Sequence, residues 1–399
     1  MKRHYLLALV AAVLLLSIPS MVFASEKVPG VTDKEVVVGL TIPITGPAAA
    51  WGVLGAGVKA WADYTNDQGG IHGRKIKIHM MDDAYNPSRA LANVQEMKDK
   101  VFAIVALTGT AVIMACRDEI VNNKIPLCNG FGDLSTWKTL SKEKLRYCFI
   151  CFPHYEDEAD ALTTYAIKEV GLKKIACFYQ NDGFGKGGLA GVNKAIKRLS
   201  NEAKLVGTVP YSVSERSLAS HAMKLKQTGA EGIVLYATMT HSALIFKEML
   251  KIGYKPKIFG PFTIGTPAMY KIAGKEWEGS YATSIGSTGM KGIDPEVDRV
   301  LKITTKYDKK IIGLENLSLL GTTSMMMMVE GLKKAGRNLT REGFVDAMLT
   351  IKDWKPEGIG TPMTFGPNRH HGTNSVRITQ ARGGTYVPVS DYIVYPPQF

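Results

Sequence analysis

The segment EVVVGLTIPITGPAAAWG, residues 35–52, decides how this chain folds. Three consecutive valines at 36–38 have no polar residue between them, which is typical of a strand covered on both faces. The two prolines that follow lack an amide hydrogen and the glycine between them frees the backbone, so the strand is predicted to end in a loop. From Gly52 onward apolar residues recur at helical spacing. Because ligands bind where strands of a parallel sheet end in such loops, Trp51 becomes a candidate binding residue.

The rest of the chain repeats this unit of strand, loop and helix. Further apolar strand segments are expected at 76–80, 102–107, 125–128, 175–179, 205–209, 231–236 and 257–259. The series runs twice with no low-complexity linker between the two parts, and 399 residues are more than one hydrophobic core usually supports. The sequence therefore predicts an α/β fold of two similar lobes, each a parallel-rich sheet flanked by helices.

The amino terminus has the pattern of an export signal. Lys2 and Arg3 precede an aliphatic run over residues 6–18, and small residues end the segment near Ala24. A membrane anchor is the competing interpretation, but the run is shorter than the roughly 20 residues that a span needs. We therefore predict a signal peptide over residues 1–24 that is cleaved after about Ala24.

The formal net charge of +13 does not by itself identify a partner. Export removes nucleic acid as a partner, and the basic residues are spread along helices, as at 194–198 and 333–337. Solvated helix faces explain this distribution, with a weak bias toward anionic ligands or membrane surfaces. The five cysteines leave at least one free thiol. Cys148 and Cys151 lie three apart on a predicted strand and so on opposite faces, which favours buried thiols over a redox or metal pair.

Two loops carry residues suited to holding a small molecule. Thr108-Gly109-Thr110 follows a predicted strand and precedes a helix, so its hydroxyls and free amides could cradle an anion at the positive end of the helix. Ordinary capping of that helix is the simpler alternative, although it needs only one of the two threonines. In the segment 129–133 glycines flank Phe131, which lets the backbone approach a ligand closely.

Several patterns that could indicate a cofactor, metal or catalytic site are incomplete, which argues against an enzyme. Residues 183–188 match G-x-G-x-x-G, but the next strand does not end in the acid that a dinucleotide site requires. Asp82-Asp83 and His370-His371 lack further ligands for a metal, and the methionine run at 325–328 spans a whole helix circumference, as in a core. The chain has no G-x-S-x-G, H-E-x-x-H or P-loop. We predict no enzyme activity, no metal and no cofactor.

Four segments together resemble the branched-chain amino acid-binding (leucine-binding) family of type I periplasmic solute-binding proteins, the receptors of ABC importers. They read VVVGLTIPITGPAAAWG, NDQGGIHGR, MDDAYNP and YQNDGFG. The resemblance implies a monomer in the periplasm that traps a solute between two lobes and delivers it to an inner-membrane ABC permease. It places crossover strands near 149–153, 281–285 and 360–366. The implied lobes are 25–150 plus 283–362, and 151–282 plus 363–399.

The resemblance and the loop patterns single out ten candidate ligand-binding residues. They are Trp51, Thr108, Thr110, Phe131, Gly132, Asp133, Tyr155, Phe184, Met239 and Phe262. The resemblance implies that Thr110 holds the ligand carboxylate, that 131–133 complete its cradle, and that Tyr155 and Phe184 cover the ligand from the second lobe. Some relatives carry a disulfide where this chain has Tyr85 and Gly109, so that bridge is absent.

Phe262 is the main departure from the family pattern. Amino acid binders of the family place an acid after Gly-Pro to pair with the ligand ammonium, and burying an ammonium without a counter-charge costs several kcal/mol. Asp133 could compensate, but it lies in the segment expected near the carboxylate. We therefore hypothesise an aromatic or other organic acid as the ligand, with an amino acid as the family default. An exported sensory module and an exported α/β enzyme remain the alternative functions.

Overall fold

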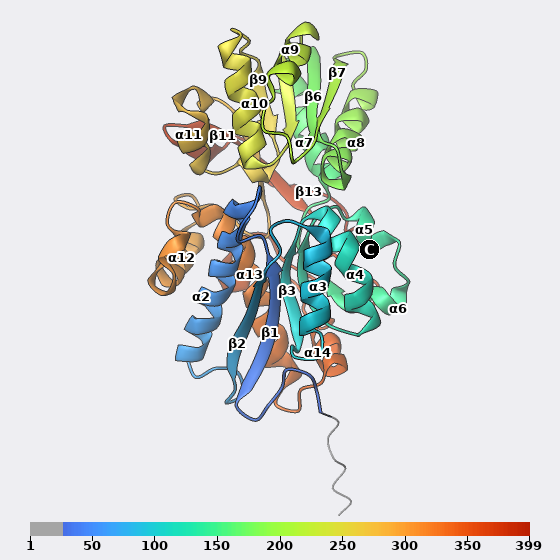
Figure 1. The fold of residues 1–399 in the computed structure, drawn as a ribbon, viewed down its shortest axis with the longest axis vertical. Coiled ribbons are helices and arrows are strands. Elements are labelled where there is room, and N and C mark those ends of the chain that lie inside the picture. Colours follow the sequence, from blue (N-terminus) through green and yellow to red (C-terminus); the bar gives the residue numbers. More distant parts are fainter. Residues whose placement is uncertain (1–26) are drawn as a thin grey trace, which may run out of the picture.

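The computed structural model describes residues 27–399 and shows two lobes, each built on its own β-sheet (Figure 1). The predicted signal peptide, residues 1–24, lies outside the described residues. The first sheet has the order β2-β1-β3-β4-β5, and its pairings are parallel. Its strands are β1 (Glu35–Ile42), β2 (Lys75–Asp82), β3 (Ala103–Thr108), β4 (Leu127–Phe131) and β5 (Cys148–Phe149).

The second sheet has the order β12-β11-β10-β9-β8-β6-β7, with β13 paired to β11. From β7 to β10 the pairings are parallel, and β11, β12 and β13 are added antiparallel. Its strands are β6 (Lys174–Gln180), β7 (Lys204–Tyr211), β8 (Gly232–Tyr236), β9 (Lys257–Gly260), β10 (Tyr281–Ile285), β11 (Ser375–Arg382), β12 (Thr385–Pro388) and β13 (Ile393–Val394). The predicted fold class, an α/β fold with two parallel-rich sheets, is confirmed.

Helices from both ends of the chain cover the first sheet. They are α2 (Val53–Asp67), α3 (Pro87–Met97), α4 (Thr110–Asn122), α5 (Ser135–Lys138), α6 (Lys142–Leu145), α12 (Pro295–Tyr307), α13 (Glu315–Ala335) and α14 (Arg341–Met348). The long helix α13 packs against α2, and the methionines at 325–328 are buried in the core as predicted. All five cysteines are free and buried, which agrees with the prediction of buried thiols. None of the helices in residues 27–399 is long and apolar enough to span a bilayer.

The second sheet is covered by α7 (Tyr155–Lys168), α8 (Gly183–Arg198), α9 (Ala219–Gln227), α10 (Met239–Lys251) and α11 (Ala268–Ala273). Two predicted boundaries were wrong. Helix α8 begins at Gly183 rather than Leu189, because the Asp182 carboxylate accepts hydrogen bonds from the amides of its first turn. Strand β4 continues to Phe131 rather than ending at Cys128, because it stays paired with β3.

The chain passes between the lobes after β5, after β10 and before β11. The first passage matches the crossover expected near 149–153, where Ile150 forms a bridge with His371 of the returning chain. The crossover expected at 281–285 is strand β10, and the lobe boundary expected between 282 and 283 falls inside it.

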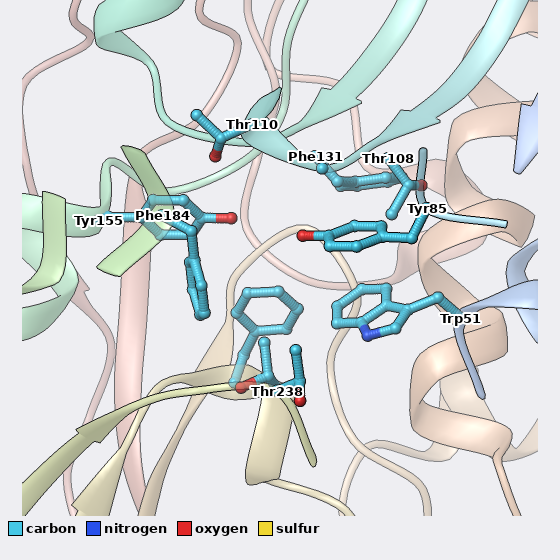
Figure 2. A pocket seen from close by; sticks show the side chains of 11 residues that line it. Trp51, Tyr85, Thr108, Thr110, Phe131, Tyr155, Phe184 and Thr238 are labelled. Carbon is cyan, nitrogen blue, oxygen red and sulfur yellow. The ribbon is translucent and has the colours of Figure 1, made fainter. Parts of the chain in front are cut away.

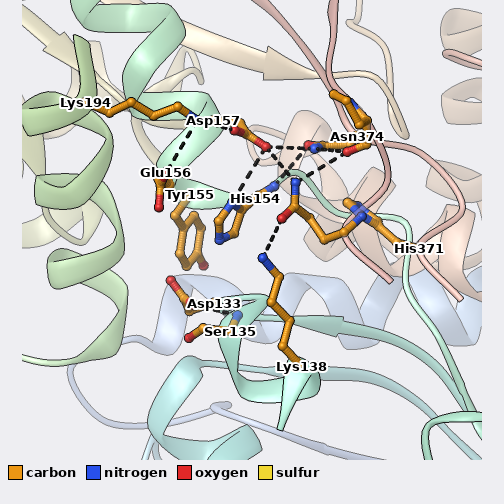
Figure 3. A network of polar contacts seen from close by, with 12 residues as sticks. Asp133, Ser135, Lys138, His154, Tyr155, Glu156, Asp157, Lys194, His371 and Asn374 are labelled. Carbon is orange, nitrogen blue, oxygen red and sulfur yellow. Dashed lines mark hydrogen bonds and ion pairs between the residues drawn. The ribbon is translucent and has the colours of Figure 1, made fainter. Parts of the chain in front are cut away.

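A polar network ties the passage after β5 to the passage before β11 (Figure 3). The amide of Asn374 donates to Asp157 Oδ2 over 2.9 Å, and the amide of Gln398 donates to the same oxygen over 3.1 Å. Gln398 in turn accepts from Lys138 of α5 over 2.6 Å, so α7 of one lobe is linked to α5 of the other. Burial works to raise the pKa of Asp157, but hydrogen bonds from His154, Asn374 and Lys194 outweigh it and lower this pKa to about 2.

Candidate functional site

A cavity lies between the two lobes, where about 390 Å³ of space, part of it open to solvent, is unfilled by atoms (Figure 2). It is lined by Trp51, Tyr85, Thr108, Gly109, Thr110, Phe131, Tyr155, Phe184, Thr238, Phe262 and Thr263. Most of these residues stand where a strand ends or a helix begins, as expected for a ligand site in an open parallel sheet. The cavity is therefore our candidate binding site.

The first lobe supplies one wall of the cavity. Trp51 lies in a 3-10 turn (Ala49–Gly52) just before α2, and Thr108 and Phe131 are the last residues of the neighbouring strands β3 and β4. Thr110 is the first residue of α4, so the positive end of that helix faces the cavity. This wall combines aromatic rings with hydroxyl and amide groups.

Tyr85 reaches this wall through a strained turn after β2. Its φ is +60°, and that of Ala84 is +51°, a left-handed conformation that bulky residues rarely adopt. The turn is held by two carboxylates, since Asp82 Oδ1 accepts from the Ala84 amide over 3.0 Å and Asp83 Oδ1 from the Tyr85 amide over 2.8 Å. The ring covers Gly109, where an added Cβ would lie 2.6 Å from it. Strain of this kind persists at sites where it positions a group for function.

The second lobe supplies a wall of packed aromatic rings. Tyr155 begins α7, Phe184 is in the first turn of α8, and Phe262 begins the 3-10 turn η2 (Phe262–Ile264). Tyr155 and Phe184 pack edge to face with ring centres 5.0 Å apart. Phe262 packs the same way against Trp51 of the opposite wall, at 5.7 Å. The rings thus form a continuous apolar surface that closes around the cavity.

The hydroxyl groups of the first wall differ in what they offer a ligand. Thr108 Oγ1 donates its hydrogen to Ala106 O over 2.9 Å, so it can only accept from a ligand. Thr110 Oγ1 accepts from the Asp133 amide over 3.0 Å, which leaves its hydrogen free to point into the cavity. Figure 2 shows the hydroxyls of Tyr85 and Tyr155 directed toward each other across the same space. Thr110 and the first amides of α4 therefore present donors to an acceptor oxygen of a ligand.

No charged side chain belongs to the cavity lining among residues 27–399. Asp133, expected beside the ligand, is buried, and its Oδ1 accepts from the Ser135 amide over 2.7 Å. Asp182 is taken up by the cap of α8. The acids near the cavity are thus engaged in the fold rather than directed at a ligand.

Glu158 is a buried acid behind the wall of the second lobe. Its Oε1 accepts from the Phe262 amide over 3.0 Å and from the Thr283 hydroxyl, and its Oε2 lies 2.8 Å from the Tyr236 hydroxyl. Burial raises the pKa of Glu158 above its usual value. The Tyr236 hydroxyl also lies 3.0 Å from the carbonyl of Tyr155, so its single hydrogen has two possible acceptors, this carbonyl and Glu158 Oε2. A proton on Glu158 completes this network, because the acid can then donate to Tyr236.

Seven of the ten candidate residues line the cavity: Trp51, Thr108, Thr110, Phe131, Tyr155, Phe184 and Phe262. Gly132, Asp133 and Met239 do not. Gly132 packs beneath the start of α4, where an added Cβ would lie 3.1 Å from the Thr110 nitrogen. Met239 is buried behind Thr238 as the first residue of α10.

Four lining residues were missed as candidates: Tyr85, Gly109, Thr238 and Thr263. The two threonines follow β8 and β9, so the rule that singled out Thr108 at a strand end could have found them. Tyr85 does not stand at a strand end. The disulfide that some relatives carry at positions 85 and 109 implies that Tyr85 lies beside Gly109, but only the left-handed turn shows that its ring enters the cavity.

The histidine pair considered for metal binding has a structural role. His371 is buried, its Nε2 lies 2.8 Å from the Phe152 carbonyl, and its Nδ1 accepts from the backbone amide of Gln398 over 3.0 Å. Burial lowers the pKa of His371 to about 4, so the ring is neutral. Within residues 27–399 no three acids, histidines or cysteines come together as a metal site would require.

Comparison with known proteins identifies the class. The model of the family "Periplasmic binding protein" matches residues 35–385, and the chain belongs to this family. The Leu/Ile/Val-binding protein homolog 3 of Brucella melitensis is 21% identical, over 76% of this chain and 80% of that protein. The Leu/Ile/Val-binding protein BraC3 of Rhizobium johnstonii is 21% identical, over 83% and 88%. The chain is thus a periplasmic solute-binding protein and not an enzyme.

Two solved structures show the same fold. A branched-chain amino acid ABC transporter protein from Thermus thermophilus with bound valine has a TM-score of 0.81 and 22% identity, covering 92% of this chain and 98% of that one. A fatty acid ABC transporter substrate-binding protein from Thermomonospora curvata has a TM-score of 0.80 and 22% identity, over 93% and 95%. Proteins of this class act in the periplasm, where they bind a small molecule and deliver it to an ABC permease.

Proposed function

We propose that this protein binds a flat organic acid, preferably an aromatic carboxylate, between its lobes and delivers it as a monomer to an inner-membrane ABC permease. The observation that carries the proposal is the composition of the cavity. Its lining combines six aromatic residues, two of which (Trp51 and Phe262) pack edge to face, with neutral hydroxyl and amide donors, and within residues 27–399 it contains no carboxylate. Such a lining suits a ligand with acceptor oxygens at one end and an apolar ring at the other.

The ligand carboxylate would lie at the start of α4. The free hydroxyl hydrogen of Thr110 and the first amides of the helix converge there, and the helix dipole favours negative charge. The ring would then lie between Trp51 and the second-lobe pair Tyr155 and Phe184. In this pose the Thr110 hydroxyl and the first amides of α4 meet the oxygens of the ligand carboxylate.

An amino acid fits this cavity less well. Its ammonium would need an acceptor with negative charge, and Asp133, Glu158 and Asp182 are engaged elsewhere. An unpaired buried ammonium costs several kcal/mol, which is a large part of the roughly 8 kcal/mol of a micromolar complex. The names of the two solved relatives mention valine and a fatty acid, so ligands with and without an ammonium are both represented in this fold.

Binding is coupled to closure of the lobes. Thr110 at the start of α4 and Gly183 at the start of α8 are in contact across the cavity, since an added Cβ on Gly183 would lie 2.6 Å from Thr110 Cγ2. A ligand that touches both walls stabilises this closed arrangement over an open one. The permease would then recognise the closed form.

Thermal unfolding of the mature protein, residues 25–399, tests the proposal. We expect benzoate and 4-hydroxybenzoate to raise the Tm, because a ligand at a hundred times its Kd stabilises by about 2.7 kcal/mol. Benzamide is the matched control, since it keeps the ring but lacks the charge. Strong stabilisation by leucine or valine together with none by the aromatic acids would overturn the proposal.

A further inference from the structure

A second cavity lies next to the binding cavity, with about 340 Å³ of unfilled space, part of it open to solvent. It is formed by the turn after Phe262, by β10 with the loop that follows it, and by the start of α13. Phe262 is the residue that the linings of both cavities share. Phe262 therefore stands between the two cavities.

Phe262 is fixed from three directions. The Phe262 ring packs edge to face against Trp51 of the first lobe at 5.7 Å and against Phe152 of the first crossover at 5.1 Å. Its backbone amide donates to Glu158 Oε1 over 3.0 Å, which ties it to α7. Only 8% of the residue is exposed. A ligand could displace the Phe262 ring only by breaking these contacts.

The second cavity has a chemistry of its own. Thr266, which accepts from the Ala268 amide over 3.3 Å, keeps its hydroxyl hydrogen, and Asn316 makes only long contacts of 3.4 and 3.5 Å. Leu317 and Leu320 add apolar surface, and no charged side chain belongs to this lining within the described part of the chain. The space suits an uncharged extension that ends in a hydroxyl or amide.

We infer that Phe262 determines ligand length in this protein. The ring closes the binding cavity toward β10 and restricts it to short ligands, whereas the adjoining space would accept a longer ligand with an uncharged polar end if the ring were removed. The inference rests on the proposed binding of a solute in the first cavity and adds what limits the size of that solute.

The test compares the wild type with F262A and with the matched control F184A. Phe184 lines the first cavity only, so its removal enlarges that cavity without joining it to the second. The probes are a short and a long ligand in each of three head-group classes. They are benzoate and 4-(2-hydroxyethoxy)benzoate, benzamide and its 4-(2-hydroxyethoxy) derivative, and phenylalanine and O-(2-hydroxyethyl)tyrosine. Calorimetry gives each Kd, and circular dichroism checks that the variants are folded.

We expect the wild type and F184A to favour the short member of the pair that binds by about tenfold or more, and F262A to favour the long member by a similar factor. The inference would be overturned if folded F262A kept the length preference of the wild type, or if the wild type bound both lengths with similar affinity. Absence of binding by all three classes would also overturn it. If the amide or amino acid pair binds while the benzoates do not, the proposed ligand class fails. The length preference then still decides the inference.

Discussion

Helices α4 and α8 begin opposite each other at the cavity, one from each lobe, yet their first turns are built differently. The first turn of α8 is capped by its own sequence, since Asp182 Oδ1 accepts from the amides of Phe184 and Gly185 over 3.0 and 3.3 Å. Helix α4 follows Gly109, at a φ of +106°, and has no side-chain cap. A glycine there offers no group of its own to the helix amides.

This difference assigns separate tasks to the two walls. The positive end of α8 already faces a carboxylate of the chain, whereas the positive end of α4 is left for a ligand. The second lobe therefore contributes the Phe184 ring rather than an anion site. We therefore expect the charged end of a ligand to bind to the first lobe and its apolar body to contact both lobes.

Giving α4 a carboxylate like that of α8 should have the largest effect. In T110D the new side chain would occupy the first amides of α4 and repel the ligand carboxylate, so we expect benzoate affinity to fall by about a hundredfold or more. An acid in the first turn is favourable for the helix, so the Tm should not fall by more than a few degrees. Calorimetry with benzoate measures the loss.

Benzamide distinguishes charge from shape in the same variant, because its neutral head group is not repelled. Its affinity should change much less than that of benzoate. Equal losses for the two ligands, or none for benzoate, would show that the carboxylate is not bound at the start of α4.

Removing the ring that faces the second lobe should have the next largest effect. W51A deletes the surface against which both the ligand and Phe262 pack. We expect affinity to fall by about tenfold to a hundredfold, since an aromatic side chain contributes about 1.5–3 kcal/mol when buried. Calorimetry with circular dichroism measures binding and folding together.

W354A is the control for Trp51, because Trp354 lines a hollow beside α2 and α13 of the first lobe and does not belong to the cavity lining. It should leave affinity unchanged. A similar loss in both variants would mean that Trp51 acts through the stability of the lobe rather than through contact with the ligand.

The sequence was sufficient for those features that depend on local pattern. The valine run, the loops at strand ends and the spacing of the helices predicted two parallel-rich lobes. The ten candidate residues came from the loop patterns together with the family resemblance, and seven of them line the cavity. The start of α8 was misplaced because glycines are poor helix formers, and only the cap by Asp182 shows why the helix includes them.

The features that the sequence could not predict depend on tertiary contacts. Tyr85 enters the cavity because two buried or partly buried aspartates hold its turn in a left-handed conformation. Asp133 was predicted to lie beside the ligand, but its carboxylate accepts from the amide of Ser135 and does not line the cavity. Whether the side chain of a loop residue points into a cavity depends on its hydrogen-bond partners in the fold and not on its residue type.

Removing the cap of α8 should affect stability and not binding. D182A leaves the amides of Phe184 and Gly185 without their acceptor, which we expect to lower the free energy of unfolding by about 1 kcal/mol. Benzoate affinity should stay the same or rise slightly, because an acid near the cavity is lost. Urea unfolding and calorimetry measure the two quantities.

D182N is the matched control, since asparagine also caps helices and should retain most of the stability. A marked loss of benzoate affinity in D182A but not in D182N would mean that α8 also helps to hold the ligand. The division of tasks between the two helices would then be wrong.

The smallest effect concerns the charge of Glu158, behind the second wall. Burial raises its pKa above the usual 4.5, so the folded protein holds this proton more tightly than the unfolded chain. The stabilisation from the protonated acid is complete below pH 4.5 and is lost as pH rises toward the folded pKa.

Glutamine keeps the acceptor for Phe262 and cannot ionise. The free energy of unfolding of E158Q relative to the wild type should therefore increase above pH 4.5, as urea unfolding across pH would measure. If the relative stability of E158Q instead fell at higher pH, the second wall would depend on an ionised carboxylate. The second wall would then not be uncharged, as the contrast between the two walls implies.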